Sequence, residues 1–467
     1  MAITADKAIE AILKVWYKDG VENLLFRNSP VLKEIGKTRV EGKQQNFAAM
    51  YSRGGAVGGD FLVAADTAAS NVKNAEFQVV PGQLFSVFSY NAKEVQSSLS
   101  KRGAYMKVAG NKAFAAAESL RKTLAAALYG TGYGELAVVG STNATAINGA
   151  TLPGDVDITL PESVIMKIDV GSKLVIKASV ASGTESVTLT VAKITGNVVT
   201  VTFAAAYTAS ATDVIALKGS MDASGNPILP VGLGAWLPYK QARTGATWTS
   251  YIATPFFGVN RSVNADALAG NFYYDSTNTT YKADVQALLR KVRRHGSEAD
   301  LIVMNDADWL KLADEIQASN TYFTQTSTRS RREANIGMDK LSASFSTNFI
   351  DLVYDDPYCP EGVFYVLDKK DVELWAYTNT TEAQEDGVSG NNPGKQDVED
   401  FNNKGKENDP YKLIIDDFIT TEPGTATSDG PAVRVTLQLY GSFVVLNPSN
   451  AGVGLFHDAV TADLVNY

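Results

Sequence analysis

The chain has 467 residues, of which 45% are apolar, and a formal net charge of −9. At roughly 150 residues per domain this length predicts about three folding units, with enough apolar residues for a sizeable core. The acidic balance excludes a protein that wraps nucleic acid tightly, because such a protein needs many Lys and Arg side chains against the phosphates. A single cysteine, Cys359, excludes an intrachain disulfide, and two histidines leave little for a catalytic triad or a zinc site.

The N-terminal stretch MAITADKAIEAILKVWYKDG has early acidic residues and no long apolar run, so it does not predict a signal peptide. No window of the chain reaches the roughly 18 consecutive apolar residues of a membrane span. We therefore expect a soluble protein made in the cytosol, without membrane contact.

The first 91 residues predict a helix followed by a projecting β arm. Within residues 4–36, apolar residues recur at three- and four-residue spacing before the pattern breaks at Pro30. The stretch GKQQNFAAMYSRGGAVGGDF then predicts a strand, and FQVVPGQLFSVFSY (77–90) predicts its return. The tip of the arm holds Gly54, Gly55, Gly58 and Gly59. A two-stranded arm cannot bury itself, so we expect it, with these glycines, to make intersubunit contacts.

Residues 92–129 have the strongest helical pattern in the chain, with an apolar period close to 3.6 residues. The apolar positions are Leu99, Met106, Phe114, Ala117, Leu120, Leu124 and Leu128. A helix of about 35 residues is roughly 50 Å long, and we expect it to end at Gly130.

Residues 137–220 predict a separate all-β unit that interrupts the chain. Val and Leu alternate with Thr at 187–191 and again at 199–203, which is typical of half-buried strands. The intervening Gly196–Asn197 predicts a two-residue hairpin turn. We expect a small sandwich or barrel of five or six short strands, and the change of composition at both borders indicates an insertion.

The remainder predicts a mixed α+β region. In chain order we expect a loop-rich connector (221–269), a helix (280–294), a buried strand (300–305), a helix (306–316), three strands (349–377), a polar surface loop (384–410) and a pair of alternating strands (433–448). Asp306 is expected to be the N-cap of the helix that it begins.

Two short motifs have a catalytic or ligand-binding interpretation and a structural one. The stretch GTGYGE (130–135) has the composition of a phosphate-binding loop, but it follows a predicted helix and no Lys-Ser/Thr follows it, which favours a helix-ending loop. The paired carboxylates Asp355 and Asp356 would point to opposite faces of a strand, so a turn before Pro357 is the better interpretation.

The remaining chemical candidates are also better explained structurally. Asp306 and Asp308 lack the rest of a calcium-loop motif, which favours helix capping. Cys359 has no helix N-terminus near it in sequence to activate a thiolate. We therefore predict no catalytic, cofactor-binding or metal-binding residue, and no enzyme activity.

Two basic runs are candidate contact sites. For RKVRRHG (290–296), contact with nucleic acid or acidic partner loops is the functional interpretation, and a solvated helix face is the favoured one. RSRREAN (329–335) follows a stretch that predicts a loop. Arginine side chains suit intersubunit salt bridges, so Arg329, Arg331 and Arg332 are predicted intersubunit contacts.

The order of these pieces, from arm to long helix to α/β region to returning C-terminal strands, resembles that of the major capsid proteins of tailed phages of the Hong Kong 97 type. The local matches are NLLFRNSPVLKEIGKT (23–38), LYGTGYGE (128–135), DLVYDDPYCPEGVFYVLDKKDVELW (351–375) and LYGSFVVLNPSNAGVG (439–454). The resemblance covers most of the chain outside about 137–220 and 384–425.

The resemblance implies a division of the chain into named parts. They are an N-terminal arm (1–40), an extended loop (41–91), a peripheral domain with the long helix (92–136 and 270–345), a β insertion domain (137–220), a connector (221–269), an axial domain (346–432) and C-terminal strands that return to the peripheral domain (433–467).

The resemblance further implies a homo-oligomeric shell of pentamers and hexamers that encloses double-stranded DNA without sequence-specific binding. A separate scaffold protein, a portal and decoration proteins are the expected partners, and the virion, assembled in the host cytoplasm, is the expected location. Some relatives join subunits by Lys–Asn crosslinks; Lys43 and Lys73 lie in or near the extended loop, and no crosslink is predicted here. The alternative is a virion surface or adhesive β-domain binding protein, which would explain 137–220 but not the long helix.

Overall fold

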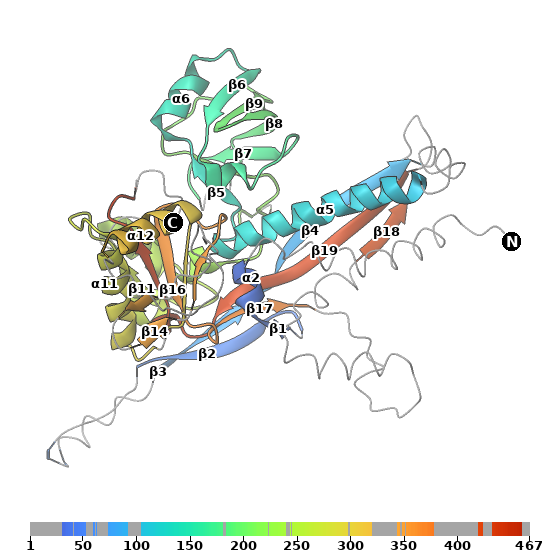
Figure 1. The fold of residues 1–467 in the computed structure, drawn as a ribbon. Coiled ribbons are helices and arrows are strands. Elements are labelled where there is room, and N and C mark those ends of the chain that lie inside the picture. The colour runs from blue at the N-terminus through green and yellow to red at the C-terminus, as the bar shows by residue number, and fades with distance from the viewer. Residues whose placement is uncertain are drawn as a thin grey trace, which may run out of the picture.

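The computed structural model describes residues 30–40, 42–52, 59–60, 62, 73–91, 104–180, 184–222, 224–239, 243, 245–297, 299–319, 343–345, 348–350, 352–377, 419–423 and 432–459. Within these ranges the chain is an α+β fold with three larger sheets and two two-stranded sheets (Figure 1).

A long helix, α5 (Ala104–Tyr129), lies along a five-stranded sheet that extends to one side of the molecule (Figure 1). The strands are β1 (Gly36–Arg39), β4 (Gly82–Asn91), β17 (Val372–Ala376), β18 (Ile419–Pro423) and β19 (Ala432–Val445), and a short helix, α2 (Pro30–Glu34), precedes β1. Leu120, Leu124 and Leu128 of α5 are buried at the predicted spacing. The predicted helix and its end before Gly130 are confirmed, and the predicted part 92–103 lies outside the described residues.

The predicted strand pair at 433–448 is wrong, because β19 is one continuous strand of 14 residues. Gly441 lies opposite Ala376 on β17, and a Cβ at this position would be 2.8 Å from the Trp375 carbonyl oxygen. The glycine therefore allows two backbones to approach closely within the sheet.

A second five-stranded sheet, in the order β11-β20-β16-β12-β15, has two helices on one face. Its elements are β11 (Asn271–Tyr273), β12 (Leu301–Met304), β15 (Leu352–Asp355), β16 (Val363–Leu367), β20 (Gly452–Leu455), α11 (Tyr281–Arg294) and α12 (Asp306–Ser319). The predicted helix at 280–294 and buried strand at 300–305 are confirmed. The N-cap of α12 is Asn305 rather than Asp306, because the Asn305 Oδ1 accepts from the Ala307 N–H, two positions into the helix (3.0 Å).

The strand pairings group the chain differently from the expected division at residue 345. β12 pairs in parallel with β15 and antiparallel with β16, so one sheet spans this boundary. β17 instead joins the long sheet through β1 and β19. The order of elements along the chain does not reveal such long-range pairings, because each strand alone fits either sheet.

A six-stranded sheet forms the upper part of the molecule in Figure 1 and has a hydrophobic core of its own. Its strands are β5 (Glu135–Val138), β6 (Asp155–Thr159), β7 (Lys173–Lys177), β8 (Val187–Thr195), β9 (Val198–Phe203) and β10 (Val214–Leu217), in the order β5-β10-β7-β8-β9-β6. The two-residue turn at Gly196–Asn197 is confirmed, with Gly196 at a φ of 57°.

The six-stranded unit is not all-β, which corrects that prediction. Two helices, α6 (Gly140–Gly149) and α7 (Glu162–Ile165), contribute to its core. On α6 only Asn143, Ala144 and Ile147 are buried. Such a narrow apolar stripe in a Ser-, Thr- and Asn-rich stretch has too little helical periodicity to be recognised in the sequence.

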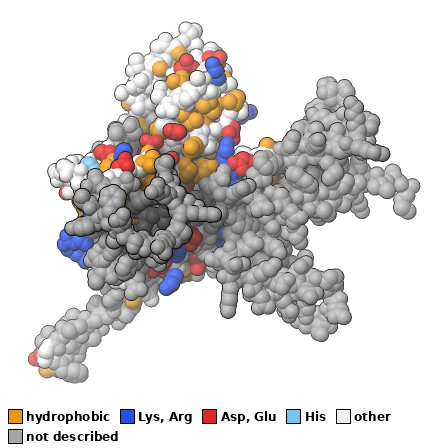
Figure 2. Space-filling view, viewed as in Figure 1, with side chains coloured by type: hydrophobic (Ala, Val, Ile, Leu, Met, Phe, Trp, Pro, Cys, Tyr) orange, Lys and Arg blue, Asp and Glu red, His pale blue; other side chains and the backbone are white. Residues whose placement is uncertain are grey.

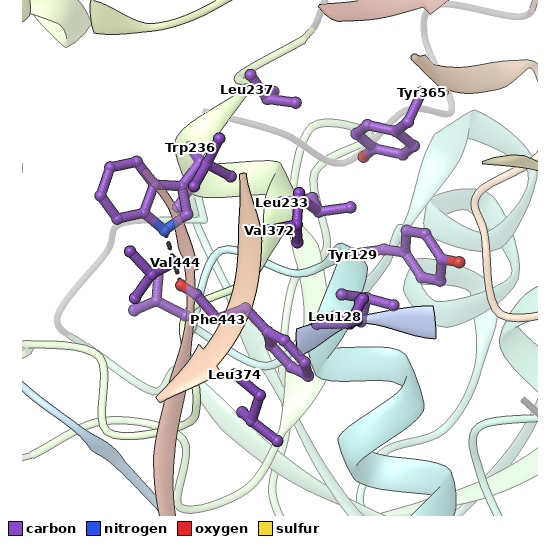
Figure 3. Packing of buried hydrophobic residues seen from close by; sticks show 14 of the residues in the cluster. Leu128, Tyr129, Leu233, Trp236, Leu237, Tyr365, Val372, Leu374, Phe443 and Val444 are labelled. Atoms are coloured by element: carbon purple, nitrogen blue, oxygen red, sulfur yellow. Dashed lines mark hydrogen bonds between the residues drawn. The ribbon is translucent and has the colours of Figure 1, made fainter. Parts of the chain in front are cut away.

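A connector of short helices packs against the long sheet through Trp236. The connector contains α8 (Leu233–Trp236), α9 (Gly245–Ala253), η1 (Arg261–Val263) and α10 (Ala265–Leu268). Outside the connector, the chain also has η3 (Pro448–Asn450) and a hairpin of β13 (Ala343–Phe345) and β14 (Asn348–Ile350). Trp236 is fully buried, and its indole N–H donates to the Phe443 carbonyl at 2.8 Å (Figure 3). This contact joins the connector to β19 in the centre of the core.

Candidate assembly surfaces

Two further strands, β2 (Gln45–Ser52) and β3 (Lys73–Val79), form an antiparallel arm whose base is fixed by aromatic packing. Phe47 and Phe77 are directly opposite each other, and their rings stack with centroids 5.2 Å apart. The Phe77 ring lies 5.1 Å from Trp236, and the Phe47 ring lies 5.6 Å from Trp375. The base of the arm is thus part of the main core rather than a loose hairpin.

The arm has no third strand in the described part of the chain. Two contacts hold it along the body: the Gln78 N–H donates to the Phe257 carbonyl (2.9 Å), and the Asn264 amide donates to the Tyr51 carbonyl (3.0 Å). Met50 on β2 is 55% exposed. A two-stranded ribbon is marginally stable by itself in water, so an exposed surface of this kind gains stability from a partner.

The two-stranded form of the predicted arm is confirmed, with Pro81 separating β3 from β4. Of the predicted tip, Gly59 is described and exposed, and Gly54, Gly55 and Gly58 lie outside the described residues. Lys43 and Lys73 are both exposed. The segment 82–91, predicted as part of the arm, pairs with β19 in the long sheet instead.

The long sheet exposes apolar side chains on the face opposite α5. Leu84 is buried, and the Ser86 hydroxyl donates to the Ala116 carbonyl of α5 at 2.8 Å. Strand alternation turns Phe85 and Val87 to the other face, where they are 47% and 53% exposed. Large apolar side chains side by side on an exposed strand are typical of a contact surface. The sequence indicates this face, because QLFSVF has apolar residues at both odd and even positions, which point to opposite faces of a strand.

Of the two predicted basic runs, one is described. The run 290–296 is the exposed end of α11 and the turn that follows it. Arg329, Arg331 and Arg332 lie outside the described residues, so their role as intersubunit contacts stays a prediction.

A cavity of about 230 Å³ lies where α5, the six-stranded unit and α12 meet. Asp308, at its wall, is 2% exposed and accepts from the Gly362 N–H at 2.6 Å. Burial raises the pKa of Asp308 to about 6. Lys311 lies 3.7 Å from Asp308 and pairs with Asp458 at 2.9 Å. The cluster joins α12 to the C-terminal turn through hydrogen bonds and an ion pair, which is a structural role.

The other sequence candidates have structural roles. Residues 130–135 connect α5 to β5, as the helix-ending interpretation predicts. Asp356 is fully buried, and its carboxylate accepts from the Tyr129 hydroxyl (2.8 Å) and the Tyr358 N–H (3.0 Å), which forms the expected turn. Cys359 is fully buried, and burial raises the pKa of its thiol well above the ordinary value, so it is not an activated nucleophile.

Within the described ranges, no three His, Cys, Asp or Glu side chains gather closely enough to hold a metal ion. No helix in the same ranges has the length and apolar content required to cross a bilayer.

No family model matches the chain, and no curated protein matches it. Among solved structures, the chain is similar to one in the Cyanophage A-1(L) capsid asymmetric unit, with 13% identity, 92% of each chain covered and a TM-score of 0.47. It is also similar to a chain of the virus-like particle from Pyrococcus furiosus (8% identity, 93% and 95% covered, TM-score 0.35). A third is the holo-SrpI encapsulin complex from Synechococcus elongatus (8% identity, 92% and 89% covered, TM-score 0.38). These TM-scores are low, so the function is argued below from the geometry of the chain itself.

Proposed function

We propose that the chain is a structural subunit of an icosahedral tailed-phage head of the Hong Kong 97 type, without a catalytic role. Copies would assemble into pentamers and hexamers that enclose packaged double-stranded DNA. The observation that carries the proposal is the β2–β3 arm, which is anchored at its base by Phe47 and Phe77 and has no third strand in the described ranges. Such an arm is stabilised when it lies on a neighbouring copy, as an interlocking shell requires.

The exposed face of β4 supports the same proposal. Phe85 and Val87 offer apolar area on the long sheet, at the opposite side from α5. An assembly interface is held by such apolar area, while its polar rim sets the register between copies. A surface adhesin built around the six-stranded unit would leave both the arm and this face without a role.

We assign the parts of the chain by strand pairing. The proposed parts are an N-terminal arm (1–40), an extended loop (41–81), a peripheral domain (82–134, 372–377 and 419–445), an insertion domain (135–220), a connector (221–269) and an axial domain (271–367 and 452–459). The insertion domain would add lateral contacts or a docking surface without altering the shell-forming core.

The proposed partners and location follow from the shell. A separate scaffold protein and a portal would act in assembly, decoration proteins would bind the outer surface, and the shell would be built in the host cytoplasm and remain in the virion. The glycines of the arm tip and the arginine run at 329–332 would lie at contacts between copies.

The proposal is tested by shortening the arm. Residues 53–72 are deleted, and Ser52 is joined to Lys73 through an Asn-Gly turn that suits a two-residue hairpin. We expect a folded chain with an unchanged far-UV circular dichroism spectrum that no longer forms shells under conditions where the full chain does. Shells of normal yield from the shortened chain would show that the arm is not an assembly element.

A further inference from the structure

We infer that the basic end of α11 and the groove beside it bind the acidic segment 382–400 of a neighbouring copy; this rests on the proposed assembly of copies into a shell. The observations that carry the inference are a cationic surface without carboxylate partners in the described ranges, a polar groove beside it, and an acidic segment of matching charge in the same sequence.

The surface is the last five residues of α11, 290–294, and the residue after them. Arg290, Arg294 and His295 are exposed, and Arg293 is half-buried. None of the three arginines has a carboxylate within 4.0 Å in the described part of the chain. Lys291 differs, because its ammonium donates to the Phe272 carbonyl at 2.7 Å. In Figure 2, Lys and Arg side chains gather at the edge of the molecule where α11 lies in Figure 1.

Stabilisation of the helix does not explain so many cations. A positive side chain in the last turn interacts favourably with the helix dipole by about 0.3–1 kcal/mol, and the effect falls off within that turn. Like charges three and four residues apart on one helix repel each other by a similar amount. Arg290 with Arg293 and Arg290 with Arg294 have these spacings. An acidic partner would relieve this repulsion.

The groove lies between the arm and the body and has a volume of about 580 Å³. Its walls are Arg294 and His295 on one side and the four consecutive residues 48–51 of β2 on the other, with Asn264, Asn447 and Asn450 also lining it. The Asn264 amide donates to the Tyr51 carbonyl at 3.0 Å, so this edge of β2 is partly occupied, and an acidic peptide in the groove would meet the side chains of Arg294, His295 and the asparagines.

The acidic segment has the charge that this surface lacks. Residues 382–400 contain Glu382, Glu385, Asp386, Asp397, Glu399 and Asp400 and one cation, Lys395, a net charge of −5 in a chain whose total is −9. The segment lies in the chain between β17 and β18, which belong to the long sheet, whereas α11 covers the other five-stranded sheet. β18 and α11 lie at opposite ends of the molecule (Figure 1). We assign the contact between copies because the proposed shell is built from heterologous contacts of this kind, which form rings.

The experiment reverses the charge of the basic surface and then the charge of the acidic segment. The variant Arg290→Glu/Arg293→Glu/Arg294→Glu is expected to remain folded and to lose shell assembly at least tenfold at a fixed concentration. Adding Glu382→Lys/Glu385→Lys/Asp386→Lys to the same chain is expected to restore assembly. The matched control, Lys173→Glu/Lys193→Glu/Lys218→Glu, makes the same charge change on exposed lysines of the six-stranded unit and is used in the binding assay, where it is expected to bind the segment as the wild type does.

A binding assay tests the inference even if the full chain stays monomeric. The probe is a synthetic peptide of residues 382–400 with a fluorophore, and its anisotropy is measured against the wild-type chain at 50 and 500 mM salt. We expect binding that weakens with salt, and at least tenfold weaker binding to the arginine variant than to the lysine control. Equal binding to both variants, or none to the wild type, would overturn the inference and leave the shell proposal intact. Normal shells from the arginine variant would also overturn it: with peptide binding lost, in favour of a contact within one copy, and with less DNA retained, in favour of a nucleic-acid contact.

Discussion

The aromatic base of the arm gives a prediction that can be worked out from the structure. In Phe77→Ala, the ring that is lost is fully buried and lies 5.2 Å from the Phe47 ring and 5.1 Å from the Trp236 ring. Truncating a buried Phe to Ala costs about 3–5 kcal/mol, because a cavity adds to the lost transfer free energy. Trp236 is held by its hydrogen bond to the Phe443 carbonyl, so the site cannot collapse easily, and we expect a loss near the middle of that range, about 4 kcal/mol.

The assay is urea unfolding followed by tryptophan fluorescence, since Trp236 and Trp375 both lie at this cluster. Phe85→Ala is the matched control, because Phe85 is 47% exposed and its truncation should cost less than about 1 kcal/mol. A loss below about 1 kcal/mol for Phe77→Ala, or equal losses for the two variants, would refute the view that the arm is anchored in the main core.

Three further predictions concern Asp308, Phe85 and Gly441. Because burial raises the pKa of Asp308 to about 6, its stabilising contribution is full below its ordinary pKa and is lost as the pH rises through 6. Asp308→Asn should therefore be more stable above pH 6 by about 1–3 kcal/mol and have a flatter urea-midpoint profile between pH 4 and 6; an unchanged profile would contradict the prediction. Phe85→Ser should leave the free energy of unfolding within about 1 kcal/mol of wild type and reduce the assembled fraction in light scattering; an unchanged fraction would remove the β4 face from the interface. Gly441→Ala should cost about 1–3 kcal/mol in urea unfolding, because its Cβ would meet the Trp375 carbonyl oxygen at 2.8 Å, whereas Gly149→Ala, with nothing within 4 Å, should not destabilise the chain.

The sequence predicted an element correctly where the spacing of apolar residues within that element was enough to identify it. The 3.6-residue period predicted α11 and the C-terminal part of α5, and the Thr/Val alternation around Gly196–Asn197 predicted the β8–β9 hairpin with its turn. Each of these patterns is set by burial of a single face, which the sequence records directly.

Long-range pairing could not be predicted in this way. The sequence does not show that β12 pairs with β15 and β16 or that β17 joins a different sheet, since all four strands are short apolar runs. The strand pair predicted at 433–448 is one strand in the structure, and Gly441 within it admits a close backbone neighbour rather than a turn, two roles that have the same sequence signal.

The candidate surfaces were predicted only in part. The arm was predicted from its glycines and flanking strands, and the basic end of α11 was recognised as a charged run. The groove beside β2 was missed because its walls come from the arm, α11 and the segment after β19, which only folding brings together. The apolar face of β4 was missed because Phe85 and Val87 were read as arm residues rather than as part of the long sheet.

The central claim is that copies of this chain build a closed shell. The most direct test is the mass and shape of the full chain, produced alone and together with the candidate scaffold protein, by light scattering after size exclusion and then by negative-stain electron microscopy. The account predicts rings or closed shells of uniform size in at least one of the two preparations. A monomer in both preparations across a series of concentrations would contradict it.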